Sequence, residues 1–261
     1  ALNTTDATST KDLEIPQEVR LYFFAGTQHG GGDQLAQPPF VMPKPPLACQ
    51  LPVNSNSFFP QQRALLSALR DWVKDGKAPP PSSYPTLAAK TLVQIAEVQF
   101  PYVPASKFTP RGVAAQRRNL DRGPDYRDVD VTGVMMEPPR IGASYPLYIP
   151  AIDSDGNHID GIRNTAVEVP LGTYTGWNVR KAGFSEGDSC DLTGAFIPFF
   201  KTKAERMAAN DPRPSLEERY PSHEAYVSKV SASAARLVGL RLMLQQDAEL
   251  IVSQAKSASI P

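Results

Sequence analysis

VRLYFFAGTQHGGG, residues Val19–Gly32, determines the fold that this sequence is expected to adopt. Its first eight residues end at Gly26 and are apolar or aromatic except for Arg20. Such continuous runs are typical of strands that are buried on both faces, as in a parallel sheet covered by helices. The glycine-rich loop that follows carries His29. Open α/β sheets place their sites beyond the carboxyl ends of the strands, so this loop is the first candidate site.

A helix is expected from about Pro60 to Asp75, because apolar residues recur there with helical spacing. Pro60 suits the first helical turn, and Gly76 suits the left-handed position after the last one. The apolar stripe, which is expected to pack against a sheet, consists of Leu65, Ala68, Leu69, Trp72 and Val73. A strand, a loop and a helix in this order are typical of α/β proteins. Residues 1–18 are polar, so the partner strands are expected to come from elsewhere.

Beyond the prolines at 79–81 the pattern changes to shorter elements. Strands are expected at Thr91–Phe100, Tyr145–Ile152 and His158–Val169, with a turn at Asp153–Asn157. Helices are expected after the capping residues Ser215 and Ser222 and over Gln246–Lys256. The chain is therefore expected to divide into residues 1–78, with the strand, the histidine loop and the helix, and residues 79–261, an α+β extension.

The composition argues against several classes of function. The 261 residues carry 27 Lys+Arg and 27 Asp+Glu, and a chain without net charge is not drawn to nucleic acid or to anionic membranes. The five arginines between residues 101 and 127 lack an aromatic platform and are interpreted as part of a solvated loop. No apolar run reaches the roughly 18 residues of a membrane-spanning helix. The cysteines and histidines lack metal-ligand spacing, so neither a metal nor a cofactor is expected.

Three features bear on the compartment of the protein. Cys49 and Cys190 either form one long-range disulfide in an oxidising compartment or remain two buried thiols. The first residue is alanine and no leader follows it, so the chain is expected to be processed or cut from something longer. The 26 prolines, the two cysteines and the neutral charge favour a periplasmic or secreted protein over a cytosolic one.

GFSEG, residues Gly183–Gly187, matches the Gly-x-Ser-x-Gly pattern around a hydrolase nucleophile. That pattern needs a strand directly before the serine and a helix directly after it. The flanking sequences WNVRKA and DSCDLTG make a poor strand and a poor helix start. Ser185 is therefore interpreted as a chance match. A self-contained hydrolase that pairs Ser185 with His29 or His223 stays open as an alternative.

Several stretches together resemble a poorly characterised bacterial family known as "alpha/beta hydrolase domain" proteins. They are VRLYFFAGTQHG at 19–30, CQLP at 49–52, RALLSALRDWVKDGKAPPP at 63–81, YTGWN at 174–178 and DPRPSLEERY at 211–220. The resemblance extends from about Val19 to Ala255, nearly the whole chain. Full-length members of the family look much longer than this chain, with most of the hydrolase sheet ahead of the histidine strand.

The resemblance implies that Val19–Gly26 is the last strand of an α/β-hydrolase sheet and that the helix ending at Asp75 covers this sheet. It also implies that His29 is the histidine of the catalytic triad. The nucleophile, the triad carboxylate and the oxyanion-hole loop would then lie upstream, outside this chain. The expected fold class is α/β, specifically the C-terminal portion of an α/β-hydrolase sheet followed by the α+β extension.

The leading hypothesis is that the chain is the C-terminal part of a serine hydrolase of esterase type. His29 would supply the general base to a serine on an N-terminal segment or a second chain, and a small-molecule ester would be the substrate. Gln28, Gly30, Tyr174 and Trp177 are expected to bind this substrate, although ordinary packing is the alternative for Tyr174 and Trp177. The rival hypothesis is a non-catalytic binding or scaffold module. Without its partner the chain is expected to fold poorly.

Overall fold

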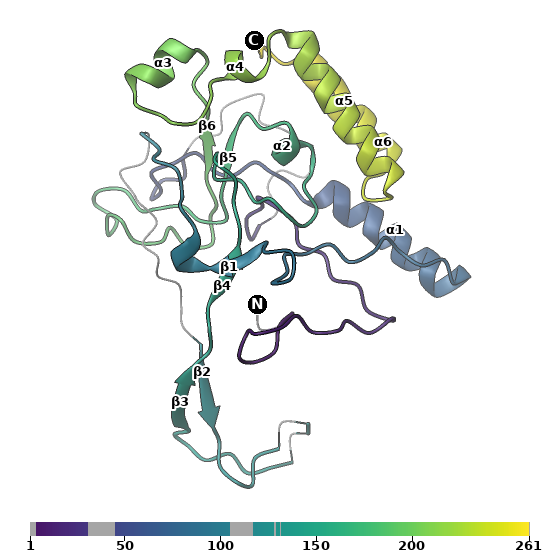
Figure 1. Ribbon diagram of the computed structural model, residues 1–261, viewed down its shortest axis with the longest axis vertical. Helices are drawn as coiled ribbons and strands as arrows, with labels where there is room; N and C mark the ends of the chain where they lie inside the picture. Colours follow the sequence, from purple (N-terminus) through teal and green to yellow (C-terminus); the bar gives the residue numbers. More distant parts are fainter. Residues whose placement is uncertain (1–3, 31–44, 105–116, 128, 131, 261) are drawn as a thin grey trace.

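The computed structural model describes residues 4–30, 45–104, 117–127, 129–130 and 132–260. Short strands and loops form an irregular body, and three longer helices lie along one side of it (Figure 1). The helices are α1 (Phe59–Asp75), the 3-10 turn η1 (Ile95–Glu97), α2 (Thr165–Glu168), α3 (Lys203–Ala208), α4 (Leu216–Arg219), α5 (His223–Gly239) and α6 (Gln245–Ser257). The strands are β1 (Leu92–Gln94), β2 (Arg118–Asp121), β3 (Arg140–Ser144), β4 (Tyr148–Pro150), β5 (Gly172–Tyr174) and β6 (Phe196–Pro198).

Among the described residues the strands pair only two at a time. β1 pairs with β4, β2 with β3, and β5 with β6, and each pair is antiparallel. The β2–β3 pair projects from the body as a hairpin (Figure 1) and has both faces exposed. The β5–β6 pair lies inside the body and is largely buried. The fold thus mixes helices and strands, as predicted, but the parallel sheet that was expected is not formed by the described residues.

The expected strand at Val19–Gly26 is an extended segment without a regular sheet. It makes two isolated parallel bridges, from Tyr22 to Ser83 and from Phe24 to Ile162. Most of the segment is only partly buried, which corrects the prediction of a strand buried on both faces. The apolar sequence specifies burial, but a parallel sheet also needs strands along both edges. Here two loop segments occupy a single edge.

Helix α1 confirms the helix expected from about Pro60 to Asp75. Proline lies in its first turn, and Gly76 ends it with a left-handed φ of 68°. The Gly76 N–H donates to the Trp72 carbonyl at 3.0 Å and the Lys77 N–H donates to the Asp71 carbonyl at 3.3 Å, which closes the last turn as this type of cap requires.

The apolar stripe of α1 is only partly used for packing. The small residues Ala64 and Ala68 are buried against the body. By contrast, Leu66, Leu69 and Val73 are 66%, 49% and 80% exposed. The prediction that the stripe lies against a sheet therefore does not hold for Leu69 and Val73 within the described part of the chain.

Helices α4, α5 and α6 were predicted, and local capping signals define the starts of α4 and α5. Ser215 and the glutamate three residues later form the capping box that starts α4. Ser222 accepts the Ala225 N–H and starts α5, and α6 covers the expected last helix. Helices α5 and α6 lie side by side (Figure 1). His223 is the first residue of α5, and its ring nitrogens lie 3.2 Å from the carbonyl oxygens of Lys256 and Ile260.

The strands predicted beyond residue 79 were correct in part. β1 occupies three residues of the expected strand Thr91–Phe100, and its partner is β4. The predicted turn Asp153–Asn157 is confirmed, because Ile152 and His158 form an antiparallel bridge around it. The last expected strand, His158–Val169, instead contains the short helix α2, since Asn164 accepts the Val167 N–H and caps a helical turn.

One apolar core joins residues from both sides of the expected boundary at residue 78. Ala25 lies in this core with buried residues of α2, β5, β6, α5 and α6. Cys49 and Cys190, whose pairing the sequence left open, form a disulfide between the two parts. Asp211 and Arg213 form an ion pair with side chains that are only 1% exposed. In the described residues no helix is both long and apolar enough to cross a membrane.

Candidate active site

The segment that leads to His29 is bonded along one edge. The Phe23 carbonyl accepts the Ile162 N–H at 2.7 Å, and the Ala25 N–H donates to the Ile162 carbonyl at 3.1 Å. The Phe23 N–H donates to the Ser83 carbonyl at 2.9 Å. These bonds fix the direction in which the chain approaches the loop of His29.

Gly26 makes the turn at the end of this segment. Its φ is 65°, a left-handed conformation that favours glycine, and a Cβ there would lie 2.9 Å from a methyl carbon of Val167. The Gly26 N–H donates to Nδ1 of His158 at 3.0 Å. Its carbonyl accepts from the amide groups of Asn54 and Asn56 at 2.9 Å and 3.0 Å. The backbone is therefore held from two directions three residues before His29.

Buried asparagines replace the missing sheet ladder around this turn. Asn54 and Asn56 are fully buried, and the Asn54 amide also donates to the Thr175 carbonyl. Asn56 in turn accepts from the amide of Asn164. Buried backbone carbonyls must be hydrogen-bonded, and here the side-chain amides of Asn54 and Asn56 donate the hydrogen bonds that the N–H groups of a neighbouring strand would otherwise donate.

His158 is the second anchor of the Gly26 turn. Its ring packs edge-on against Phe23, with the ring centroids 5.2 Å apart. Burial lowers the pKa of His158 to about 4, because the charged imidazolium loses its hydration there. The neutral ring accepts the Gly26 N–H at Nδ1, so its proton lies on Nε2. His158 was missed in the sequence, where it follows a turn and has no motif around it.

Gln28 is held at both ends of its side-chain amide. Nε2 donates to the Asn54 carbonyl at 2.8 Å, and Oε1 accepts the Gly194 N–H at 2.7 Å. The side chain thus connects the loop to two other segments of the body. The prediction that Gln28 binds substrate is untested, and the structure gives its amide two partners within the protein.

His29 and Gly30 lie at the exposed end of this anchored segment. A Cβ added to Gly30 would meet no heavy atom of the described residues within 4 Å. The next residues of the predicted glycine-rich loop, Gly31 and Gly32, lie outside the described residues. An exposed imidazole on an anchored backbone is accessible to a reacting group that approaches from outside.

The two predicted aromatic site residues differ in their surroundings. Tyr174 is 1% exposed and its ring packs at a tilt against Phe196, so it lies in the core, and burial raises the pKa of its hydroxyl well above the usual value. Trp177 is partly exposed and packs edge-on against Phe100. Of the two, Trp177 has the ring that can contact a molecule from solution.

The Gly183–Gly187 motif is the tip of a hairpin. Val179 and Ser189 form an antiparallel bridge on either side of it, and the Asp188 N–H donates to the Ser185 carbonyl. No strand enters this described stretch and no helix follows it, in contrast to a nucleophile elbow. Ser185 is exposed and has a φ of 62°.

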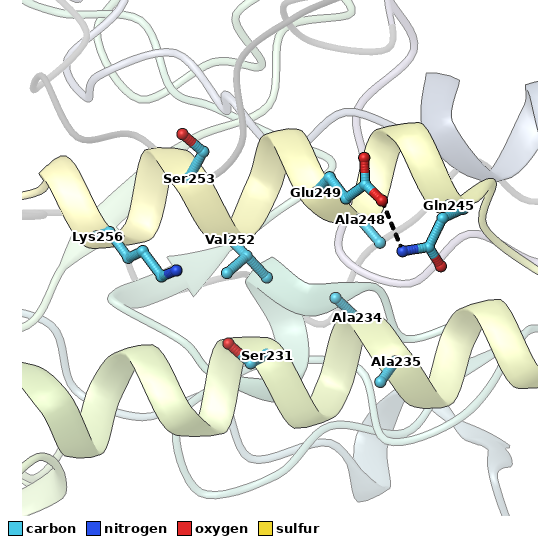
Figure 2. A pocket seen from close by; sticks show the side chains of 9 residues that line it. All are labelled: Ser231, Ala234, Ala235, Gln245, Ala248, Glu249, Val252, Ser253 and Lys256. Carbon is cyan, nitrogen blue, oxygen red and sulfur yellow. Dashed lines mark hydrogen bonds between the residues drawn. The ribbon is translucent and has the colours of Figure 1, made fainter.

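A groove of about 350 Å³ lies between α5 and α6 (Figure 2). Small and polar side chains of the two helices line it, among them Ser231, Ala234 and Glu249. The Ser231 hydroxyl donates to the Val227 carbonyl of its own helix, and Glu249 accepts from Gln245. These contacts engage the Ser231 hydroxyl and the Glu249 carboxylate within the protein. The described residues hold no cluster of metal-ligating side chains.

The comparison with known families matches this chain over residues 2–253 to the family described as "Alpha/beta hydrolase domain". The chain belongs to this family. No curated protein and no solved structure matches it. Membership supports a hydrolase and agrees with the mixed helix and strand content. Because the family match covers almost the whole chain, it does not separate a C-terminal portion from an entire domain.

Proposed function

We propose that this protein acts as a serine hydrolase of esterase type in which His29 is the general base. The observation that carries the proposal is an exposed histidine at the end of a backbone segment that is anchored on buried side chains. General bases act best when the backbone that carries them is fixed and the imidazole can reach the reacting hydroxyl. The family membership supplies the reaction class, hydrolysis.

In the proposed mechanism Nε2 or Nδ1 of His29 takes the proton of a serine hydroxyl while the serine oxygen attacks the acyl carbon of an ester. The same imidazole then gives this proton to the alcohol that leaves. His29 then takes a proton from water while the water oxygen attacks the acyl carbon of the acyl-enzyme. When the acyl–serine bond breaks, the imidazolium returns this proton to the serine oxygen and the carboxylic acid leaves. A carboxylate beside the other ring nitrogen would fix the tautomer and stabilise the imidazolium.

We further propose that the serine and this carboxylate come from an additional segment or a second chain that completes the sheet. The free edge of the segment before Gly26 supports this. The N–H and C=O groups of Tyr22 and the N–H of Phe24 form no hydrogen bond with any described residue. The residues between them bond on the opposite edge, so the free groups form the kind of edge to which another strand can be added.

The exposed face of α1 supports the same proposal. Leu66, Leu69 and Val73 line a groove of about 630 Å³ together with Arg70 and Leu244. Large apolar side chains grouped in this way typically mark an interaction surface. The disulfide between Cys49 and Cys190 is consistent with a periplasmic or secreted location, which we retain as part of the proposal.

The test is fluorophosphonate labelling of the protein purified from its natural source, followed by intact and peptide mass spectrometry. We expect the label on a serine outside residues 1–261. His29→Ala should lower both labelling and ester hydrolysis by at least about 10³-fold. The control His223→Ala, which changes the partly buried first residue of α5, should alter them by no more than about twofold.

Two outcomes contradict the proposal. A label on Ser185 would show that the chain contains its own nucleophile. Absence of labelling and of esterase activity in the complete protein would favour the non-catalytic binding module.

A further inference from the structure

We propose that Gln28 is the positioning residue of His29, through a side-chain bridge between two backbone segments, and that it is not a substrate ligand. This inference rests on the proposed function of His29. Gln28 precedes His29 directly, and its amide connects the loop to Asn54 and to Gly194.

The bridge has a defined orientation. The amide nitrogen faces the Asn54 carbonyl and the amide oxygen faces the Gly194 N–H. Rotation of the amide by 180° would place its oxygen against the Asn54 carbonyl, an acceptor against an acceptor, and its nitrogen against the Gly194 N–H, a donor against a donor. The side chain is therefore fixed by both segments at once. Fixing it also fixes the direction in which the main chain leaves toward His29.

Close packing strengthens the bridge at Gly194. A Cβ on Gly194 would lie 2.2 Å from the Thr175 carbonyl oxygen, 2.8 Å from Cβ of Gln28 and 3.1 Å from Cβ of Asn54. The stem of Gln28 is thus in contact with a position where only glycine fits. This contact leaves the side chain little freedom to swing toward a substrate.

The bridge also joins the anchors of the Gly26 turn. Asn54 accepts from Gln28 through its backbone carbonyl, while its side chain donates to the Gly26 carbonyl. Asn54 therefore holds the chain at Gly26, three residues before His29, and at Gln28, one residue before it. Loss of Gln28 would leave the first point and remove the second.

The experiment compares Gln28→Met with Gln50→Met in the complete protein. Methionine keeps the length of the side chain and removes its hydrogen bonds. Gln50 is the matched control, because its Nε2 donates to the Arg180 carbonyl at 2.8 Å in a similarly part-buried setting. Amide ¹⁵N relaxation should show an order parameter for His29 that falls from about 0.85 to below about 0.6 in the Gln28 variant only.

Ester hydrolysis gives the second readout. We expect kcat to fall ten- to a hundredfold for Gln28→Met with KM unchanged, because a shift of the base of about 1 Å has this effect. A rise in KM with kcat unchanged would make Gln28 a substrate ligand and overturn the inference. An unchanged order parameter at His29 would also overturn it.

A variant-free measurement covers the case in which Gln28→Met does not fold. In the unmodified protein the side-chain amide of Gln28 should exchange its hydrogens more slowly than an exposed glutamine amide, and exchange at the exposed rate would refute the bridge. The relaxation and exchange readouts do not need catalysis. If they agree with the bridge while the complete protein lacks esterase activity, the proposed function has failed and the bridge has not.

Discussion

The neutral state of His158 makes the stability of this protein depend on pH. Its pKa is about 4 in the folded protein, against 6.5 for an unperturbed histidine. The unfolded chain therefore binds a proton between these two pKa values that the folded chain does not bind. The stabilising contribution is fully present above about pH 6.5 and is lost as the pH falls toward 4. Each tenfold difference in proton affinity corresponds to about 1.4 kcal/mol, so the full loss is about 3 kcal/mol.

The substitution His158→Asn isolates this effect. Oδ1 of asparagine can accept the Gly26 N–H in place of Nδ1, but it does not titrate. We expect the difference in unfolding free energy between the original protein and the variant to shrink by about 2 kcal/mol from about pH 7.5 to about pH 5. Urea denaturation at several pH values measures it. Carboxylates titrate equally in both proteins and cancel in the difference.

His223→Asn is the control for this comparison, since His223 is the first residue of α5 and its ring lies against the carbonyls of Lys256 and Ile260 rather than against Gly26. Parallel loss of stability in the original protein and in His158→Asn would refute the reasoning. It would mean that His158 has the same pKa in the folded protein as in the unfolded chain, so that burial does not keep the ring neutral.

The remaining predictions concern the disulfide and the buried ion pair. Cys49 and Cys190 are 141 residues apart in sequence, and reducing their disulfide should lower the urea midpoint. The loss of unfolding free energy expected from chain entropy is at most about 5 kcal/mol. An unchanged midpoint would indicate that the reduced ends stay together. Asp211→Asn should cost about 3–5 kcal/mol, because it leaves the guanidinium of Arg213 buried without its counter-charge. The matched change Asp191→Asn, in an exposed ion pair, should cost less than about 1 kcal/mol in the same thermal melt.

The parts of the fold that the sequence predicted well depend on local signals. The cap at Gly76, the capping box at Ser215 and the turn at Asp153–Asn157 involve residues within a few positions of one another. Such signals depend on neighbouring residues and can be recognised in a single sequence, although the Asn164 cap of α2, which is of the same kind, was overlooked in favour of a strand.

The anchors of the candidate site could not be deduced in this way. Asn54 and His158 bond to Gly26 from positions 28 and 132 residues away in sequence. Neither lies in a periodic pattern, and a buried polar residue has no composition signal that separates it from an exposed one. The pairing of Cys49 with Cys190 was undetermined for the same reason, since spacing does not reveal distance in space.

The incorrect strand prediction is informative about the whole molecule. The segment before Gly26 has the composition of a strand with neighbours on both edges, yet the described residues occupy one edge only. Helix α1, which follows it, likewise has a sequence suited to burial but exposes large apolar side chains in the described structure. Burying the exposed parts of Leu66, Leu69 and Val73 would contribute about 3–5 kcal/mol before the entropy cost of association.

The two incomplete surfaces belong to one structural unit. Arg20 lies over the ring of Trp72, and Phe24 stacks on Phe58 at the start of α1, so the segment and the helix are in direct contact. A strand added to the free edge at Tyr22 and Phe24 would run beside the segment that leads to His29. In the proposed mechanism the same partner supplies the serine. Under this proposal, completion of the sheet and assembly of the active site are a single event, because the added strand and the serine come from the same partner.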